Sequence, residues 1–168
     1  SLESGDERRL ATALRLFEDN IDFDHLVQRV LGTRSHTLTP VMFERQLIAR
    51  AREDRRHIVL PEGQDDRILL AADRLLRRDV VRLTVLGDPV EVAARSAALG
   101  LDLSHADVVD PHNDVHRRVY AEAILQARRA KGMSPETAYD LAADPSWFGT
   151  LMVQTGAADG MVSGAAHT

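Results

Sequence analysis

Short apolar runs, each closed by turn-forming residues and separated by a helical stretch, constrain the fold of this chain most. The runs cover residues 57–60, 83–86, 108–109 and 161–162. Helices long enough to cross a sheet lie between them, which indicates parallel strands joined by right-handed crossovers. The runs are continuously apolar, as expected of strands covered on both faces. The pattern predicts an α/β fold, a three-layer α/β/α domain with a mostly parallel sheet.

The stretches between the runs supply the predicted crossover helices. Their apolar residues recur every three or four positions, and a proline often stands at the first helical position. The predicted helices cover residues 66–78, 90–99 and 114–131, a segment opening at Ser134-Pro135, and residues 145–155.

The residues ahead of the first run are expected to form helices as well. Residues 6–31 carry apolar side chains at helical spacing in two stretches, and residues 32–37 form a polar break. Another helix opens at Thr39-Pro40, where threonine can cap and proline fits the first turn. Its apolar stripe is expected to be buried: Phe43, Leu47, Ile48 and Ala51. The prediction is a helical tail and linker over 1–36 and a larger domain over 37–168.

Composition narrows the classes of function. The 168 residues contain no cysteine, which excludes disulfides, thiolate metal sites and a cysteine nucleophile within the chain. The seven histidines show no metal-ligand spacing, so no metal site is expected. A net charge of −5 argues against a nucleic-acid partner, and no apolar run approaches the length of a membrane span. We expect a cytoplasmic protein without a membrane partner.

The ends of the predicted strands are the best place for chemistry. In an open parallel sheet, ligands bind beyond the carboxyl ends of the strands. Glu62 follows the first run and is a possible cleft residue. Asp88 and Asp110 follow the second and third runs, and their neighbouring prolines favour a role as turn and helix caps.

The fourth run leads into Ser163, Gly164, His167 and Thr168. Ser163 and His167 could form a nucleophile and its base, but the surrounding residues lack the strand–turn–helix elbow of such sites. A loop whose hydroxyls and backbone N–H groups hold a phosphate or an acyl oxygen is the favoured interpretation. A plain polar turn remains the alternative.

Arg128 opens a basic cluster that ends at Gly132. Cations in the last turn of a helix suit the helix dipole, and this alone favours a structural role. The alternative is a clamp for a phosphate-bearing ligand, because guanidinium binds phosphate at two points.

Several ordered motifs carry a resemblance to a known family. They are Ile58–Gly63 with Arg67, residues 85–89, residues 108–111, residues 128–133, residues 148–152, and the run 158–168, which reads ADGMVSGAAHT. Residues 40–168 resemble the acyltransferase domain of the phosphate acetyltransferase family, and the last run is the most specific. The match covers about the first half of the family's domain, which implies the first lobe of a two-lobe acyltransferase.

The resemblance implies a reversible acetyl transfer between coenzyme A and inorganic phosphate, with acetyl-CoA and acetyl phosphate as the acyl carriers. It also implies that the coenzyme A thiolate attacks directly in a ternary complex, without a metal, a bound cofactor or a covalent enzyme intermediate. The resemblance also implies that Arg128 binds coenzyme A and that Ser163, Gly164, His167 and Thr168 border the acyl phosphate. The catalytic residues are expected beyond Thr168, and a homo-oligomer is expected for the complete protein.

Two other functions stay open at this point. One is phosphate butyryltransferase, from the same family. The other is a non-catalytic acyl-CoA-binding or assembly module, such as the similar domain at the end of some malic enzymes.

Overall fold

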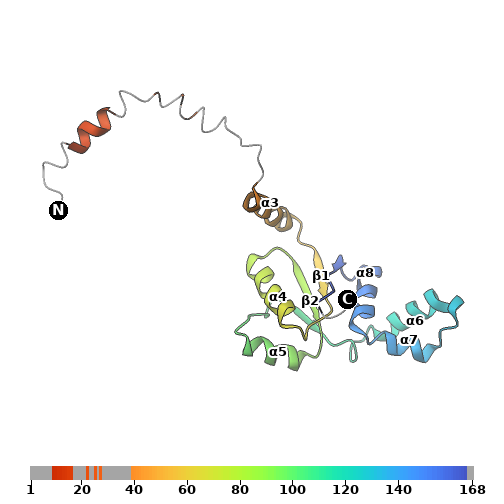
Figure 1. Cartoon of the computed structure of the whole chain (residues 1–168). Coiled ribbons are helices and arrows are strands. Elements are labelled where there is room, and N and C mark those ends of the chain that lie inside the picture. The colour runs from red at the N-terminus through yellow and green to blue at the C-terminus, as the bar shows by residue number, and fades with distance from the viewer. Residues whose placement is uncertain (1–8, 17–21, 23–24, 26, 28–38, 166–168) are drawn as a thin grey trace. The chain divides into compact units, whose positions relative to one another are not determined.

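A computed structural model describes residues 9–16, 22, 25, 27 and 39–165. The chain divides into two units, residues 1–43 and 44–168. In the first unit, residues 9–16 are helical, as predicted (Figure 1). The predicted linker over 32–37 and most of the predicted second helix lie outside the described residues.

The second unit is built on a parallel sheet with the strand order β3-β2-β1-β4. The strands are β1 (His57–Leu60), β2 (Arg82–Leu86), β3 (Asp107–Val109) and β4 (Gly160–Met161). They match the predicted apolar runs to within one residue at either end. Strand order could not be deduced from the sequence, because it depends on pairing between segments that lie far apart in the chain.

The register brings the carboxyl ends of the strands to one edge of the sheet. Leu60 lies opposite Val85, Leu86 lies opposite Val109, and Met161 lies opposite Val59. The loops that leave β1, β2, β3 and β4 therefore start close together.

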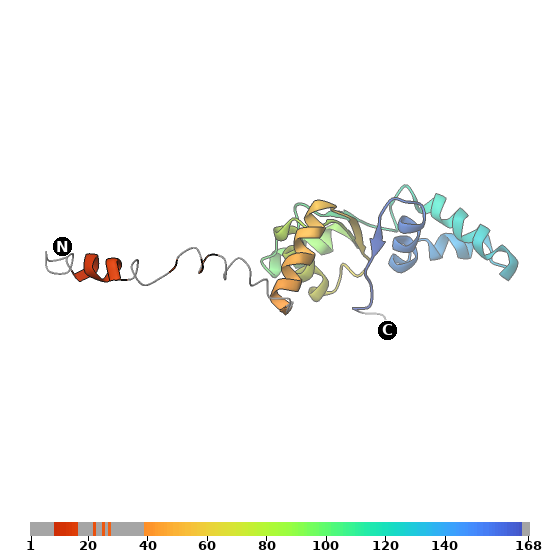
Figure 2. The ribbon, with the colours of Figure 1, turned by 90° about the horizontal axis from the view of Figure 1, so that it is seen from above.

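Helices cover both faces of this sheet (Figures 1 and 2). Helices α4 (Asp66–Arg78) and α5 (Pro89–Ala98) pack on one face. Helix α8 (Pro145–Gln154) packs on the other, with α6 (Arg117–Arg128) and α7 (Pro135–Leu141) side by side beyond it. This confirms the predicted three-layer α/β/α arrangement.

Each face of the sheet has its own apolar cluster. The cluster under α4 and α5 contains Leu60, Leu69, Ala72, Leu83, Val85 and Val92. The cluster under α8 contains Val59, Leu86, Tyr120, Ala121, Ile124, Ala138, Ala142, Phe148, Leu151, Met152 and Ala158. Aliphatic residues dominate both clusters, and two aromatic rings of the second, Tyr120 and Phe148, meet edge to face at 4.8 Å.

Short polar side chains start the helices, as the sequence predicts. Asp88 accepts a hydrogen bond from the N–H of Val90 at 2.7 Å and caps α5. Asp110 accepts one from the N–H of His112 at 2.9 Å and closes the turn after β3. The cap and turn roles predicted for Asp88 and Asp110 are confirmed.

Helix α6 is shorter than the predicted helix over 114–131. Asp114 accepts a hydrogen bond from the N–H of His116 at 2.7 Å, and this turn delays the helix to Arg117. After Arg128 the chain tightens into the 3-10 turn η1 (Arg129–Lys131). Gly132 ends it with a φ of 70°, a conformation that glycine adopts without strain.

Helix α3 (Pro40–Glu53) forms where predicted, and Thr39 caps it by accepting from the N–H of Met42 at 3.2 Å. The prediction that its apolar stripe is buried is wrong: Phe43 is 50% exposed and Leu47 is 48% exposed. Capping and helical spacing are local properties, whereas burial needs a facing element. Among the described residues, none of α3 is buried.

Candidate functional site

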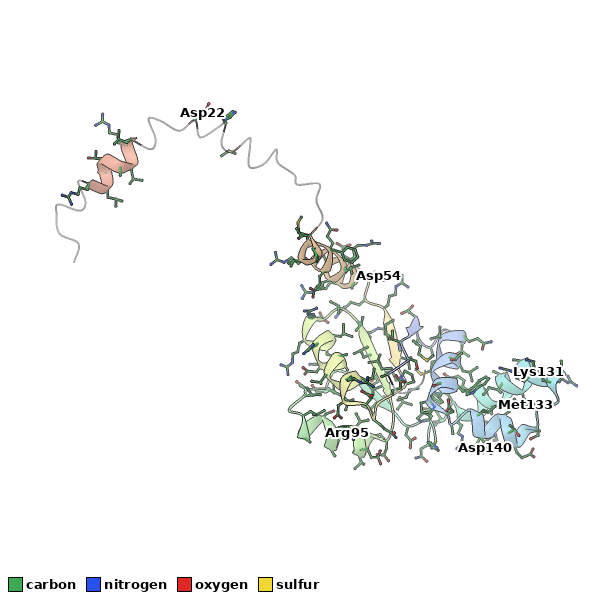
Figure 3. All side chains as sticks on the ribbon, in the orientation of Figure 1. Asp22, Asp54, Arg95, Lys131, Met133 and Asp140 are labelled. Atoms are coloured by element: carbon green, nitrogen blue, oxygen red, sulfur yellow. The ribbon has the colours of Figure 1, made fainter. Side chains whose placement is uncertain are left out.

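A cavity of about 220 Å³ lies at the carboxyl ends of β1 and β2. Its lining comes from the last residue of β2, the loops after both strands and the first residue of α8: Pro61, Glu62, Gly63, Gln64, Asp65, Leu86, Gly87 and Pro145. A second, more open hollow borders it at Gly63 and Gln64 and continues over α5 to Arg95, which is labelled in Figure 3. The cavity lies where open α/β sheets bind ligands.

Glycine at position 63 lets the two strand-end loops approach closely. The N–H of Gly63 donates to the carbonyl of Leu86 at 3.1 Å. A Cβ atom on residue 63 would lie 2.5 Å from that same oxygen, which is too close for any side chain. The glycine after Glu62 is therefore required by the closeness of β1 and β2 at this edge.

Glu62 reaches across the edge to the turn that follows β4. Its carboxylate is buried, with the residue 7% exposed. It accepts hydrogen bonds from the N–H of Gly164 at 3.1 Å and from the N–H of Ala165 at 2.8 Å. Glu62 and Gly164, two residues predicted to be in the site, are thus brought together.

Arg67, near the start of α4, holds the same turn from the other side. Its guanidinium donates to the carbonyl of Ala165 and, at 2.6 Å, to the carboxylate of Asp65. Hydrogen bonds from Arg67 hold the pKa of Asp65 at about 2, although partial burial opposes this effect. The residues predicted for the site did not include Arg67 or Ala165, although both belong to sequence motifs named above: Arg67 follows Gly63, and Ala165 lies in the run 158–168.

Ser163 and Gly164 are exposed at the rim of the edge. Gly164 has a φ of 118°, which only glycine adopts readily, so the turn needs glycine at this position. The N–H of Gly164 already has an acceptor in Glu62. His167 and Thr168 lie outside the described residues, and the substrate-binding role of all four positions stays a prediction.

Arg128 lies at the end of α6, against α8. Its guanidinium carbon is 5.2 Å from the centre of the Trp147 ring, within range of a cation–π interaction. Trp147 follows Pro145, a cavity-lining residue, by two positions. Between described residues, Arg128 makes no hydrogen bond with the turn at 163–165. Its role in coenzyme A binding stays a prediction.

Lys131 and Met133, which follow Arg128 in the chain, lie at the end of the α6–α7 pair (Figure 3).

In the described part of the chain, no three histidine, aspartate or glutamate side chains come together as a metal site. None of its described helices is both long and apolar enough to cross a bilayer.

Comparison with known families agrees with this geometry. The family described as phosphate acetyl/butaryl transferase matches residues 42–168. The chain belongs to this family. The match includes the loop after β1, the α6–α7 pair and the turn after β4, so all the described residues of the candidate site lie within it.

Curated relatives show the same similarity, one of them over nearly the whole chain. A phosphate acetyltransferase of Nitratidesulfovibrio vulgaris is 45% identical over 99% of this chain and 24% of its own length. One of Corynebacterium glutamicum is 48% identical over 76% of this chain and 39% of its own length. The chain thus spans between a quarter and two fifths of these relatives.

Solved structures show the same fold. A phosphotransacetylase from Staphylococcus aureus superposes with a TM-score of 0.66 at 35% identity, covering 73% of this chain and 38% of its own. One from Streptococcus pyogenes gives a TM-score of 0.66 at 33% identity, covering 74% of this chain and 39% of its own. The α/β fold of this family member is therefore shared with phosphotransacetylases.

Proposed function

We propose that this chain is part of a phosphate acetyltransferase. The thiolate sulfur of coenzyme A attacks the carbonyl carbon of acetyl phosphate. A C–S bond forms, the C–O bond to the phosphate breaks, and inorganic phosphate leaves; the reverse reaction returns acetyl phosphate. The observation that carries the proposal is the 45% identity over 99% of the chain to a relative named phosphate acetyltransferase.

The chain's own residues contribute binding and positioning. Arg128 binds a phosphate of coenzyme A, for which a guanidinium group is well suited. Ser163 and Gly164, with His167 and Thr168 after them, border the acyl phosphate. Fixed donors and a fixed geometry supply much of the acceleration of such a transfer, without a metal or a covalent enzyme intermediate. The groups that act on the reacting atoms belong to the part of the relatives that this chain does not span.

The direct test is acetyl transfer by the full-length gene product. Coenzyme A and acetyl phosphate should give acetyl-CoA and one equivalent of inorganic phosphate, and the 168 residues alone should give no turnover. If the full-length product forms no thioester, the proposal fails. If the 168-residue chain alone forms the thioester, the catalytic groups lie within this chain, and the proposal that they lie outside it is wrong.

The acyl group is the finer part of the proposal. The family description names both acetyl and butyryl transfer, and the relatives cited above are named for acetyl. We therefore expect kcat/KM to be higher for acetyl phosphate than for butyryl phosphate. The reverse order would assign the protein to the butyryl branch.

The remaining expectations concern the complete protein. We expect a cytoplasmic homo-oligomer that acts on small molecules, acetyl-CoA and phosphate, without nucleic-acid or membrane partners. The molar mass of the full-length gene product in solution tests the oligomer, and a monomeric mass would contradict it.

A further inference from the structure

The carboxylate of Glu62 is committed to the turn after β4. Its Oε2 atom accepts from the N–H of Ala165 at 2.8 Å and from the N–H of Gly164 at 3.1 Å, and Oε1 lies 3.3 Å from the latter. Burying a carboxylate is costly unless donors face it, and here two backbone N–H groups do so. A residue that merely ended β1 would not need a buried charge aimed at a segment 102 residues away.

The turn depends on side chains because the sheet ends before it. Strand β4 covers two residues, and the last ladder-like bond runs from the N–H of Val162 to the carbonyl of Val59 at 3.0 Å. Beyond that point, the hydrogen bonds that hold the turn to the rest of the described chain come from Glu62 and Arg67. Glu62 accepts hydrogen bonds from the backbone N–H groups of the turn, and Arg67 donates one to a backbone carbonyl of the turn.

We propose that Glu62 is a positioning residue of the acyl phosphate site. Its carboxylate fixes the Gly164–Ala165 turn and so sets where the neighbouring Ser163 lies. The inference rests on the proposed function for the identity of the substrate. Glu62 acts through the turn and takes no part in proton transfer.

Two substitutions separate reach from charge. Glu62→Asp keeps the negative charge but is one methylene shorter, so it cannot accept from both N–H groups at hydrogen-bond distance. Glu62→Gln keeps the length but leaves one acceptor oxygen and places an NH₂ group against backbone donors. If Glu62 acts by positioning the turn, neither variant holds the turn as the unmutated protein does. If only the negative charge matters, Glu62→Asp behaves like the unmutated protein. Glu122→Gln, an exposed glutamate on α6, is the matched control.

The first measurement needs no activity. Amide hydrogen exchange in the 168-residue chain should become about tenfold faster or more at Gly164 and Ala165 in both Glu62 variants, with Val162 unchanged. Unchanged exchange at both positions would overturn the proposal. If the variants do not fold, the unmutated chain provides the test. A scalar coupling across the hydrogen bond, between the Ala165 nitrogen and the Glu62 carboxyl carbon, is then expected, and its absence overturns the proposal.

The second measurement uses the full-length gene product. A displacement of about 1 Å at a reacting group can cost about a hundredfold in rate. Both Glu62 variants should therefore lower kcat for acetyl transfer by about tenfold to a hundredfold. The KM for coenzyme A should stay within about twofold, because Arg128 lies on another element. A purely structural role would lower the amount of folded enzyme without this split.

Two outcomes distinguish the inference from the function on which it rests. Faster exchange at Gly164 and Ala165 with an unchanged kcat shows that the turn is held by Glu62 but is not important to the site, and overturns the inference. An unmutated full-length product without acetyl transfer overturns the proposed function, while the exchange result still reports on the turn.

Discussion

Asp65 shows how a single residue couples the site to pH. It caps α4, accepting from the N–H of Arg67 at 2.8 Å, and the Arg67 guanidinium holds its pKa at about 2. Because this pKa is lower in the folded chain than in the unfolded one, the stabilisation is present above about pH 4 and is lost as the pH falls towards 2.

The corresponding prediction concerns Asp65→Asn, which keeps the helix cap but loses the charge. The unmutated chain should be more stable than the variant at pH 5, and the difference should shrink steadily as the pH falls to about 2. Urea denaturation across this range measures it. Arg67→Ala should weaken the same pH dependence, since the backbone N–H groups that also lower the pKa of Asp65 remain. A difference between the unmutated chain and Asp65→Asn that stays constant with pH would contradict the assignment.

Ser96, near the end of α5, tests a buried hydroxyl. It is 6% exposed, and its oxygen has no hydrogen-bond partner in the described chain. Removing an unsatisfied buried hydroxyl and introducing a better helix former should raise the free energy of unfolding of Ser96→Ala by about 0.5 kcal/mol. Ser134→Ala is the control of opposite sign, because Ser134 caps α7 at 3.1 Å from the N–H of Thr137 and its loss should cost about 1 kcal/mol. Destabilisation of Ser96→Ala would show that the hydroxyl is satisfied in solution.

At the scale of single residues, what the sequence can predict depends on how many positions separate two interacting residues in the chain. The caps at Asp88 and Ser134 involve residues two or three positions away, so composition and spacing identify them. The bond between Glu62 and Gly164 spans 102 positions and exists only once the sheet has formed. The sequence could therefore name Glu62 as a cleft residue but could not say what its carboxylate binds.

At the scale of helices and strands, β1 and α3 show the same limit: the sequence predicts local structure but not long-range contacts. The run at 57–60 forms β1 with the predicted bounds, because the apolar Ile58, Val59 and Leu60 suit a strand covered on both faces. Helix α3 has equally good helical spacing, yet its apolar stripe remains exposed. Periodicity shows which face of a helix is apolar. Whether that face is buried depends on whether another element packs against it, and periodicity does not show this.

A pair of leucines turns this contrast into a measurement. Leu47 of α3 is 48% exposed, whereas Leu69 of α4 is fully buried. In the 168-residue chain, Leu47→Ala should change the free energy of unfolding by no more than about 0.5 kcal/mol. Leu69→Ala should lower it by about 2–5 kcal/mol, because it leaves a cavity in the core. A large loss at Leu47 would mean that the α3 face is covered in solution.

For the whole molecule, the parallel sheet brings the site together from distant parts of the chain. Glu62 follows β1, Gly164 follows β4, and Arg128 ends α6, where it lies over Trp147 of α8. A right-handed parallel arrangement was predictable, and with it the gathering of strand ends at one edge. The contact between Arg128 and Trp147 was not predictable, since it depends on how the α6–α7 pair packs beyond α8.

Arg128 and the turn at 163–165 belong to different elements and share no hydrogen bond between described residues, so we expect that binding of the two substrates can be perturbed independently. In the full-length gene product, Arg128→Ala should raise the KM for coenzyme A about tenfold, the loss expected for one charge-assisted contact to phosphate, and leave the KM for acetyl phosphate within about twofold. Arg118→Ala, an exposed arginine on the same helix, should change neither value. Steady-state kinetics with each substrate varied in turn provide the measurement. An unchanged KM for coenzyme A in Arg128→Ala would leave Arg128 with the helix dipole and the Trp147 ring as its only roles.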